Sequence, residues 1–184
     1  MHALLRLADA VDRFSRGIAG GVKWLALFLV LLQFVVVLLR YAYGSSFIWM
    51  QEGVIYTNAV LFMLAIGYTF MVDGHVRVDV LYAGWSARRR ALVDLVGILV
   101  AVLPFCALLA WASWPFVAMS WRMEEGPLQY GGLPLTPWLK SLIPAMAVLL
   151  GLQSLSIAVR AVAVLAGQAE THMPAKPIAT SAHG

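Results

Sequence analysis

The amino-acid sequence predicts an all-α membrane protein with four transmembrane helices. Of its 184 residues, 62% are hydrophobic and 12% are charged, whereas a typical soluble domain is about 45–50% apolar and about 25% charged. The apolar residues gather in four stretches of about 18 residues or more, a length that crosses the hydrocarbon core of a bilayer. This composition excludes an ordinary soluble enzyme, and also a disordered chain, which needs low hydrophobicity and many charges.

Each of the four stretches is expected to be helical, because backbone groups inside a bilayer have no water to bond. The predicted spans are residues 22–43, 50–72, 91–119 and 138–163, within a membrane domain of residues 1–166. The cores of these spans hold no charged residue, and tryptophan and tyrosine mark their ends, as in the aromatic belts of membrane proteins. Three amides lie inside the spans, and their simplest interpretation is hydrogen bonding between helices. They are Gln33, Asn58 and Gln153.

The basic residues predict that both termini are cytoplasmic, because positive charge is enriched on that side of membrane proteins. Ten Lys and Arg residues lie in the two terminal segments and the loop between the second and third spans, against three in the other two loops. The ten are Arg6, Arg13, Arg16, Lys23, Arg77, Arg88, Arg89, Arg90, Arg160 and Lys176, and the three are Arg40, Arg122 and Lys140. Residues 167–184 are rich in Ala, Pro, Thr and His, and are predicted to be a disordered cytoplasmic tail.

The segment before the first span has helical periodicity and two interpretations. Its apolar residues recur every three or four positions, and most of the intervening residues are polar. The apolar set is Leu4, Leu7, Val11, Phe14 and Ile18, and the polar set is Arg6, Asp9, Asp12, Arg13 and Arg16. One interpretation is an amphipathic helix that lies on the inner membrane surface. The other is a simple helical extension of the first span, and the sequence leaves both open.

The predicted spans lack the residues that chemistry inside a membrane needs. Ion and proton pathways usually contain an intramembrane ionisable residue, and a membrane cytochrome b needs axial histidines within its helices. The single cysteine, Cys106, excludes a disulfide within the chain and a multi-cysteine metal site. We therefore predict no catalytic or metal site, no cofactor and no nucleic-acid partner. The chain is expected to be a small membrane subunit that assists another protein, and not an enzyme.

Several short motifs in a fixed order give the chain a recognisable pattern. They are Arg40-Tyr41, Trp49 to Glu52, Asp73 to Asp79, Arg88 to Arg90, and Gly131 to Lys140. With these motifs the chain, from about residue 22 to residue 160, resembles the small membrane subunit of tripartite ATP-independent periplasmic (TRAP) transporters. Two residues depart from the family pattern. Gln51 stands where an acid is common, and Glu125 precedes a glycine where a serine is common.

The resemblance implies a role in the bacterial inner membrane. TRAP transporters take up organic acids, usually carboxylates, with a sodium gradient. A periplasmic binding protein captures the substrate, and a large permease subunit holds the sodium and substrate sites. The small subunit packs on the large one as a static scaffold, and help in docking the binding protein is a further expectation. The alternatives are a membrane-anchor subunit of a redox complex, which needs haem or quinone ligands, and a self-contained exporter, which needs an intramembrane acid.

The first candidate site residues flank the short loop between the first two spans. Arg40 and Tyr41 end the first span, and Glu52 lies near the start of the second. An ion pair between Arg40 and Glu52 would fix this hairpin near the headgroups. Two independent interfacial charges are the alternative interpretation.

The other candidates lie in the following loops. His75, Arg77 and Asp79 form the turn after the second span. Asp79 is expected to accept hydrogen bonds from His75 or nearby amides and so close the turn, and a solvated loop is the alternative. Trp49 and Trp138 are candidate anchors for a partner, although anchoring in the lipid interface explains them as well.

Overall fold

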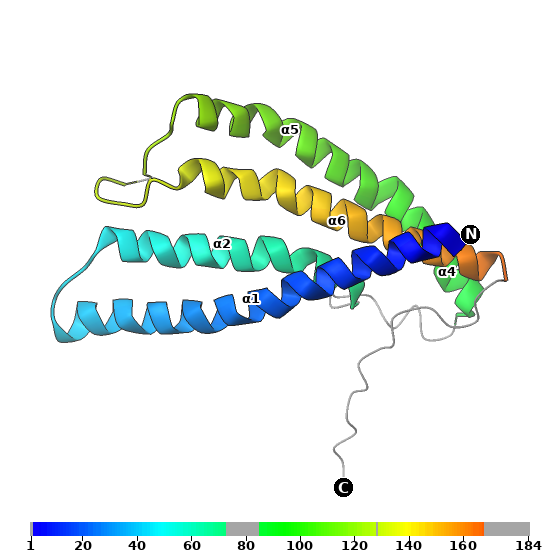
Figure 1. The fold of residues 1–184 in the computed structure, drawn as a ribbon, viewed down its shortest axis with the longest axis horizontal. Coiled ribbons are helices and arrows are strands. Elements are labelled where there is room, and N and C mark those ends of the chain that lie inside the picture. Colours follow the sequence, from blue (N-terminus) through cyan, green and yellow to red (C-terminus); the bar gives the residue numbers. More distant parts are fainter. Residues whose placement is uncertain (1, 73–84, 128, 168–184) are drawn as a thin grey trace, which may run out of the picture.

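The computed structural model describes residues 2–72, 85–127 and 129–167, and these residues form helices and their connections (Figure 1). The elements are α1 (His2–Ala42), α2 (Ile48–Met71), α4 (Ala87–Gly97), the π-helix η1 (Ile98–Val102), α5 (Leu103–Arg122) and α6 (Thr136–Leu165). Because α4, η1 and α5 follow one another without a break, the described chain contains four long rods. All four are long and apolar enough to cross a membrane, which confirms the predicted all-α membrane class.

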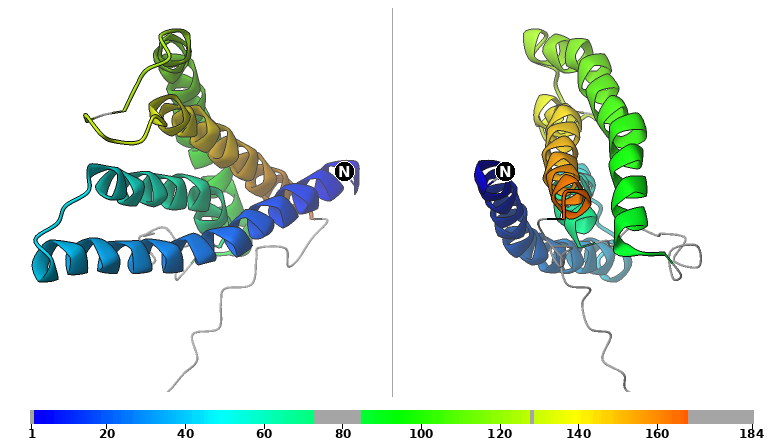
Figure 2. Two further views of the ribbon diagram at one scale, coloured as in Figure 1. Left: turned by 60° about the vertical axis from the view of Figure 1, so that its left-hand side comes forward. Right: turned by 90° about the vertical axis from the view of Figure 1, so that its right-hand side faces the viewer.

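The four rods lie side by side in the order α1, α2, α6, α5 (Figure 1). The connections α1–α2 and α5–α6 share one end of the bundle, called the loop end below. The N-terminus, the start of α4 and the end of α6 share the opposite end, called the terminal end (Figures 1 and 2). Helix α6 contacts α1, α2, α4 and α5. It is therefore the element on which the rest of the bundle packs.

Helix α1 runs without interruption from the terminal end to the loop end. The segment before the first predicted span belongs to this helix, as the second of the two sequence interpretations describes. Its placement on a membrane surface stays a prediction. The polar residues Asp12 and Ser15 are buried, while Leu7 and Phe14 are exposed. The N-terminal part of α1 therefore turns a stripe of small and polar residues, Ala8, Asp12 and Ser15, to the bundle, where it crosses α6 (Figure 2).

The third rod changes from α- to π-geometry next to a proline. Pro104 is the second residue after the π-helix, near the middle of the rod. In a regular α-helix its ring would clash with the carbonyl of Val100, and it has no N–H to donate there. The π-helical turn, a bulge within the helix, lies just before this position. The rod continues past Pro104 to Arg122 as a helix.

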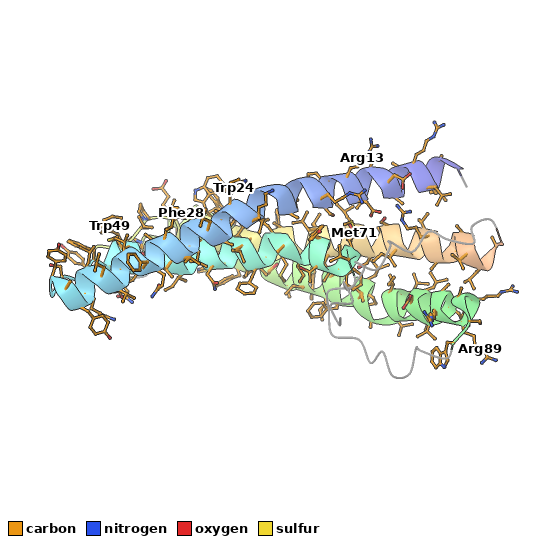
Figure 3. The ribbon with its side chains drawn as sticks, turned by 90° about the horizontal axis from the view of Figure 1, so that it is seen from below. Arg13, Trp24, Phe28, Trp49, Met71 and Arg89 are labelled. Carbon is orange, nitrogen blue, oxygen red and sulfur yellow. The ribbon has the colours of Figure 1, made fainter. Side chains whose placement is uncertain are left out.

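Small and polar side chains are prominent inside the bundle, and many large apolar side chains face outward. The largest side chains that are fully buried are Gln153, Thr136 and Ser154. Large apolar side chains such as Trp24 and Phe28 are exposed on α1 (Figure 3). This is the reverse of a soluble protein, but it suits a bundle whose helices approach through small residues and hydrogen bonds within lipid.

Candidate functional site

Glu52 is a buried carboxylate at the loop end of the bundle. It lies near the start of α2 and is 2% exposed. Its Oε1 accepts a hydrogen bond from the backbone N–H of Gln129 at 3.0 Å, and its Oε2 accepts one from the backbone N–H of Leu133 at 2.6 Å. Both donors belong to the α5–α6 connection. One side chain of α2 therefore holds that connection against the bundle, with the charge-assisted bonds that a carboxylate forms best.

The backbone of the connection fits closely around this carboxylate. A Cβ added to Gly132 would lie 2.2 Å from Oε2 of Glu52, so that only glycine leaves room for the carboxylate. Gly131, with a φ of +81°, adopts a conformation that suits glycine. The hydroxyl of Tyr56, one turn along α2, donates to the carbonyl of Leu133 at 3.4 Å. We call Glu52, Tyr56, Gly132 and Leu133 the loop-end contact.

The predicted ion pair between Arg40 and Glu52 is not formed within the described chain. Both carboxylate oxygens of Glu52 are bonded to the α5–α6 connection, while Arg40 is exposed in the last turn of α1. Backbone donors satisfy a buried carboxylate without ordering a long side chain, which explains why they replace the arginine. Arg40 thus stands as a separate charge, and Tyr41 beside it is 82% exposed.

A second acidic residue links α5 to α6 at the loop end. Glu125 accepts a hydrogen bond from the hydroxyl of Ser120 at 2.5 Å and forms an ion pair with Lys140. The hydrogen bond from Lys140, and to a lesser degree the one from Ser120, holds the pKa of Glu125 below its ordinary value. The ammonium of Lys140 also lies 4.0 Å from the ring centroid of Phe116. Lys140 therefore bridges the start of α6 and the last turns of α5.

The two candidate tryptophans lie at the loop end and differ in their contacts. Trp138 is 63% exposed and packs edge-on against Trp121, with ring centroids 5.0 Å apart. Trp49 is 49% exposed and has Phe47 beside it, at a centroid distance of 6.3 Å. Figure 3 places Trp49 at the end of the bundle opposite to Arg13. Both tryptophans therefore leave large apolar surface uncovered, available to lipid or to a partner.

A network of polar side chains joins α1 to α6 nearer the terminal end. Gln153 is completely buried on α6. Its Oε1 accepts a hydrogen bond from the hydroxyl of Ser15 at 2.7 Å, and its Nε2 donates to Oδ1 of Asp12 at 2.8 Å. The hydroxyl of Ser156, one turn further along α6, donates to the same Oδ1 at 2.9 Å. The amide is therefore used between helices, as its sequence interpretation proposed.

An arginine completes this network. One nitrogen of Arg160, Nη2, donates to Oδ2 of Asp12 and to Oδ1 of Asp9, at 2.7 Å in each case. Asp12 is buried and Asp9 is largely exposed. The buried carboxylate thus has partners on both oxygens, as a charge in a dry setting requires. We call Asp9, Asp12, Ser15, Gln153, Ser156 and Arg160 the α1–α6 network.

Most of the α1–α6 network was not singled out by the sequence interpretation. On α1, Asp12 and Ser15 are three residues apart, and on α6 the polar residues Gln153, Ser156 and Arg160 are spaced by three and four. Such spacing puts each set on one helix face. A polar stripe on each helix indicates that both helices can take part in a polar contact. Only the fold shows that these two stripes face each other.

The remaining candidates, His75, Arg77 and Asp79, lie outside the described residues. Within residues 2–72, 85–127 and 129–167, the structure contains no group of three or more His, Cys, Asp or Glu side chains that could hold a metal ion. The polar groups that it does bring together bond to one another or to backbone.

Fold and contacts together define a helical membrane protein whose buried charges join its own helices and loop. The sequence matches the family of tripartite ATP-independent periplasmic transporters, DctQ component, over residues 29–164. The chain therefore belongs to this family and is a small DctQ component of a TRAP transporter. No curated protein and no solved structure matches it. The matched range begins within α1, and includes the loop-end contact and the whole α6 side of the α1–α6 network.

Proposed function

We propose that this chain is the scaffold subunit of a sodium-coupled TRAP transporter that takes up organic acids across a bacterial inner membrane. In this proposal it packs on the large permease subunit and helps to dock the periplasmic binding protein. The large subunit supplies the sodium and substrate sites, and this chain enlarges the part that stays fixed while substrate moves. The family match supports the transporter class.

The scaffold role is supported mainly by the two buried carboxylates, which bond to other elements of the same chain. Glu52 has both oxygens bonded to the α5–α6 connection, and Asp12 has both oxygens bonded to α6. A carboxylate that serves a moving ion must exchange its partners, whereas these two tie elements of one chain together. The same groups that would draw attention as transport residues therefore make the bundle rigid.

The uncovered aromatic surface at the loop end supports the docking role. Trp49, Trp138 and Tyr130 are all exposed there, and aromatic residues are enriched where proteins bind one another. If the termini are cytoplasmic, as the basic residues predict, this end faces the periplasm and the binding protein. The alternative of a redox membrane anchor gains no support from the family match.

Co-purification tests the proposal. A tagged copy of this chain, co-expressed with the large permease subunit of the same transporter, is solubilised in mild detergent and captured through its tag. We expect the two subunits to elute together in a fixed ratio through a second, size-based column. If the large subunit stays in the flow-through while the tagged chain is folded and helical, the scaffold role is wrong.

A further inference from the structure

Two amides on neighbouring helices face out of the bundle within the predicted membrane spans. Gln33 on α1 and Asn58 on α2 are both exposed. Within the described part of the chain, neither side chain has a hydrogen-bond partner, in contrast to Gln153, the third amide of the spans. An amide that faces hydrocarbon loses its bonds to water and gains none in return, which costs free energy.

Both amides lie well inside their helices. Asn58 lies further from the loop end than Gln33, because Leu32, next to Gln33, is level with Gly53, five residues before Asn58. Gln33 is nine residues from the end of α1 at Ala42, and Asn58 is ten residues from the start of α2 at Ile48. At about 1.5 Å per residue, each amide is about 14–15 Å from the loop-end terminus of its own helix. That is about half the thickness of the hydrocarbon core. Neither side chain is long enough to reach the headgroups from there.

Both amides also point to the same side of the helix pair. Leu32 of α1 faces Gly53 of α2, because a Cβ added to Gly53 would meet Leu32 Cδ2 at 3.5 Å. Gln33 follows Leu32 by one residue, a turn of about 100°, and Asn58 follows Gly53 by five, a net turn of about 140°. Because the two helices run in opposite directions (Figure 1), these rotations of the same sense bring both side chains to one side of the pair.

Exposed apolar side chains surround each amide in the same pattern. On each helix, one precedes the amide by three residues and one follows it by four, which places all three on one helix face. The resulting surface consists of Val30, Gln33, Val37, Ile55, Asn58 and Phe62. We call it the amide face. Its two amides are of the kind that form hydrogen bonds across helix interfaces in membranes.

We propose that the amide face is the surface on which a transmembrane helix of the large permease subunit packs, with a hydrogen-bonding group opposite Gln33 and Asn58. The inference rests on the proposed function for the identity of the partner. The choice of a protein helix over lipid rests on the amides, because acyl chains offer neither donor nor acceptor. The outward side of α5 is the matched contrast. Trp111, eleven residues from the end of α5 and 77% exposed, lies at a similar depth with an apolar ring.

Site-specific photocrosslinking in the co-expressed, membrane-embedded complex tests the face. A photoreactive amino acid is placed at position 33, 58 or 111, one position at a time. We expect positions 33 and 58 to crosslink to the large subunit and position 111 to label lipid. Crosslinks from 111 alone, lipid adducts alone at 33 and 58, or crosslinks from these to a second copy of this chain, would each overturn the proposal.

Substitutions give a second, quantitative readout. Because the two amides have no partner among the described residues, Gln33→Leu and Asn58→Leu should leave the thermal stability of the isolated subunit unchanged. Each should weaken co-purification with the large subunit roughly threefold, and together roughly tenfold, the size expected for interhelical hydrogen bonds in membranes. Trp111→Leu is the control and should bind normally. Undiminished binding of the double variant would contradict the proposal.

The inference and the proposed function fail in different ways. If the subunits co-purify but the crosslinks come from α5, only the amide face is wrong. If positions 33 and 58 crosslink to a different membrane protein, and the large subunit never co-purifies, the surface packs on a helix and the transporter role is wrong.

Discussion

At the scale of single residues, Glu52 is the side chain with the clearest structural task. Two backbone N–H groups of the α5–α6 connection depend on it. Removing a buried acceptor leaves its donors without partners, which costs about 1–3 kcal/mol for such groups. We expect Glu52→Ala to lower the unfolding temperature of the subunit in detergent and to expose the connection to limited proteolysis.

The matched control for that change is Arg40→Ala. Arg40 is exposed at the same end of the bundle and forms no ion pair with Glu52 within the described residues. Its removal should change the unfolding temperature little, as is usual for surface charges. Equal losses in the two variants would show that the pair acts together after all.

Gly132 offers a steric test of the same contact. Its missing Cβ is the space that the Glu52 carboxylate occupies. Gly132→Ala should therefore displace the connection and reduce stability by about as much as Glu52→Ala, and the two losses should not add in the double variant, because they break the same contact. A Gly126→Ala variant, where an added Cβ meets nothing within 4 Å, is the control. Additive losses would mean that Gly132 matters for another reason.

The ion pair of Glu125 with Lys140 predicts an acid dependence. The pKa of Glu125 is lowered in the folded chain from an ordinary value of 4.5, so folding favours the ionised form. The stabilisation is complete above about pH 4.5 and is lost as the pH falls through the lowered pKa. The difference in unfolding temperature between the natural protein and Glu125→Gln should therefore shrink between about pH 7 and about pH 3. A difference that does not change with pH would contradict this, and Glu124→Gln is the control.

At the scale of elements, the α1–α6 network fixes the N-terminal part of α1 on α6. Asp12→Ala leaves Arg160 with only the exposed Asp9 as a partner and removes the acceptor of Gln153 and Ser156. Breaking a buried pair from one side costs about 3–5 kcal/mol. The same change at Asp9, whose side chain is largely exposed, should cost about 0–1 kcal/mol. Thermal unfolding in detergent, followed by circular dichroism, measures both.

The double variant Asp12→Ala with Arg160→Met distinguishes stabilisation by the ion pair from stabilisation by side-chain packing alone. Removing both charges leaves no buried ion unpaired, and such replacements are often neutral. We expect it to recover part of the stability that Asp12→Ala loses. A double variant less stable than either single change would show that the two side chains stabilise α1 independently.

The elements were predictable from the sequence, and their contacts were not. Apolar length alone identifies the four rods, because the bilayer demands about 20 residues per crossing. The hydrogen bond between Glu52 and Leu133 could not be predicted, because its donor is a backbone N–H in a distant loop. Arg40 is nearer to Glu52 in the sequence and was therefore the expected partner. Asp12 was interpreted as part of a polar outer face, because a single helix pattern cannot say which side another helix covers. Gln153 was interpreted correctly, because a buried amide has few other uses.

At the scale of the whole molecule, the orientation in the membrane remains a prediction from the basic residues. Arg13 and Arg89 lie at the terminal end and Trp49 at the loop end (Figure 3), so the charge bias runs along the long axis of the bundle. Reporter fusions at the C-terminus and near Gln129 should report cytoplasmic and periplasmic locations, respectively. A C-terminal fusion that is active only in the periplasm would reverse the topology.

The scaffold role makes a distinct claim about transport. The buried carboxylates of the described chain are bonded to its own elements, so this chain should not move substrate by itself. The large subunit, in turn, should need it for a stable position in the membrane. The two subunits are therefore expected to act only as a pair with the binding protein.

Uptake by reconstituted liposomes tests this claim most directly. Vesicles that contain this chain alone, the large subunit alone, or both are given a sodium gradient, the binding protein and a radiolabelled organic acid. We expect uptake only when both membrane subunits are present, and its loss when the sodium gradient is collapsed. Sodium-driven uptake by vesicles that contain this chain alone, or full uptake by the large subunit without it, would contradict the account.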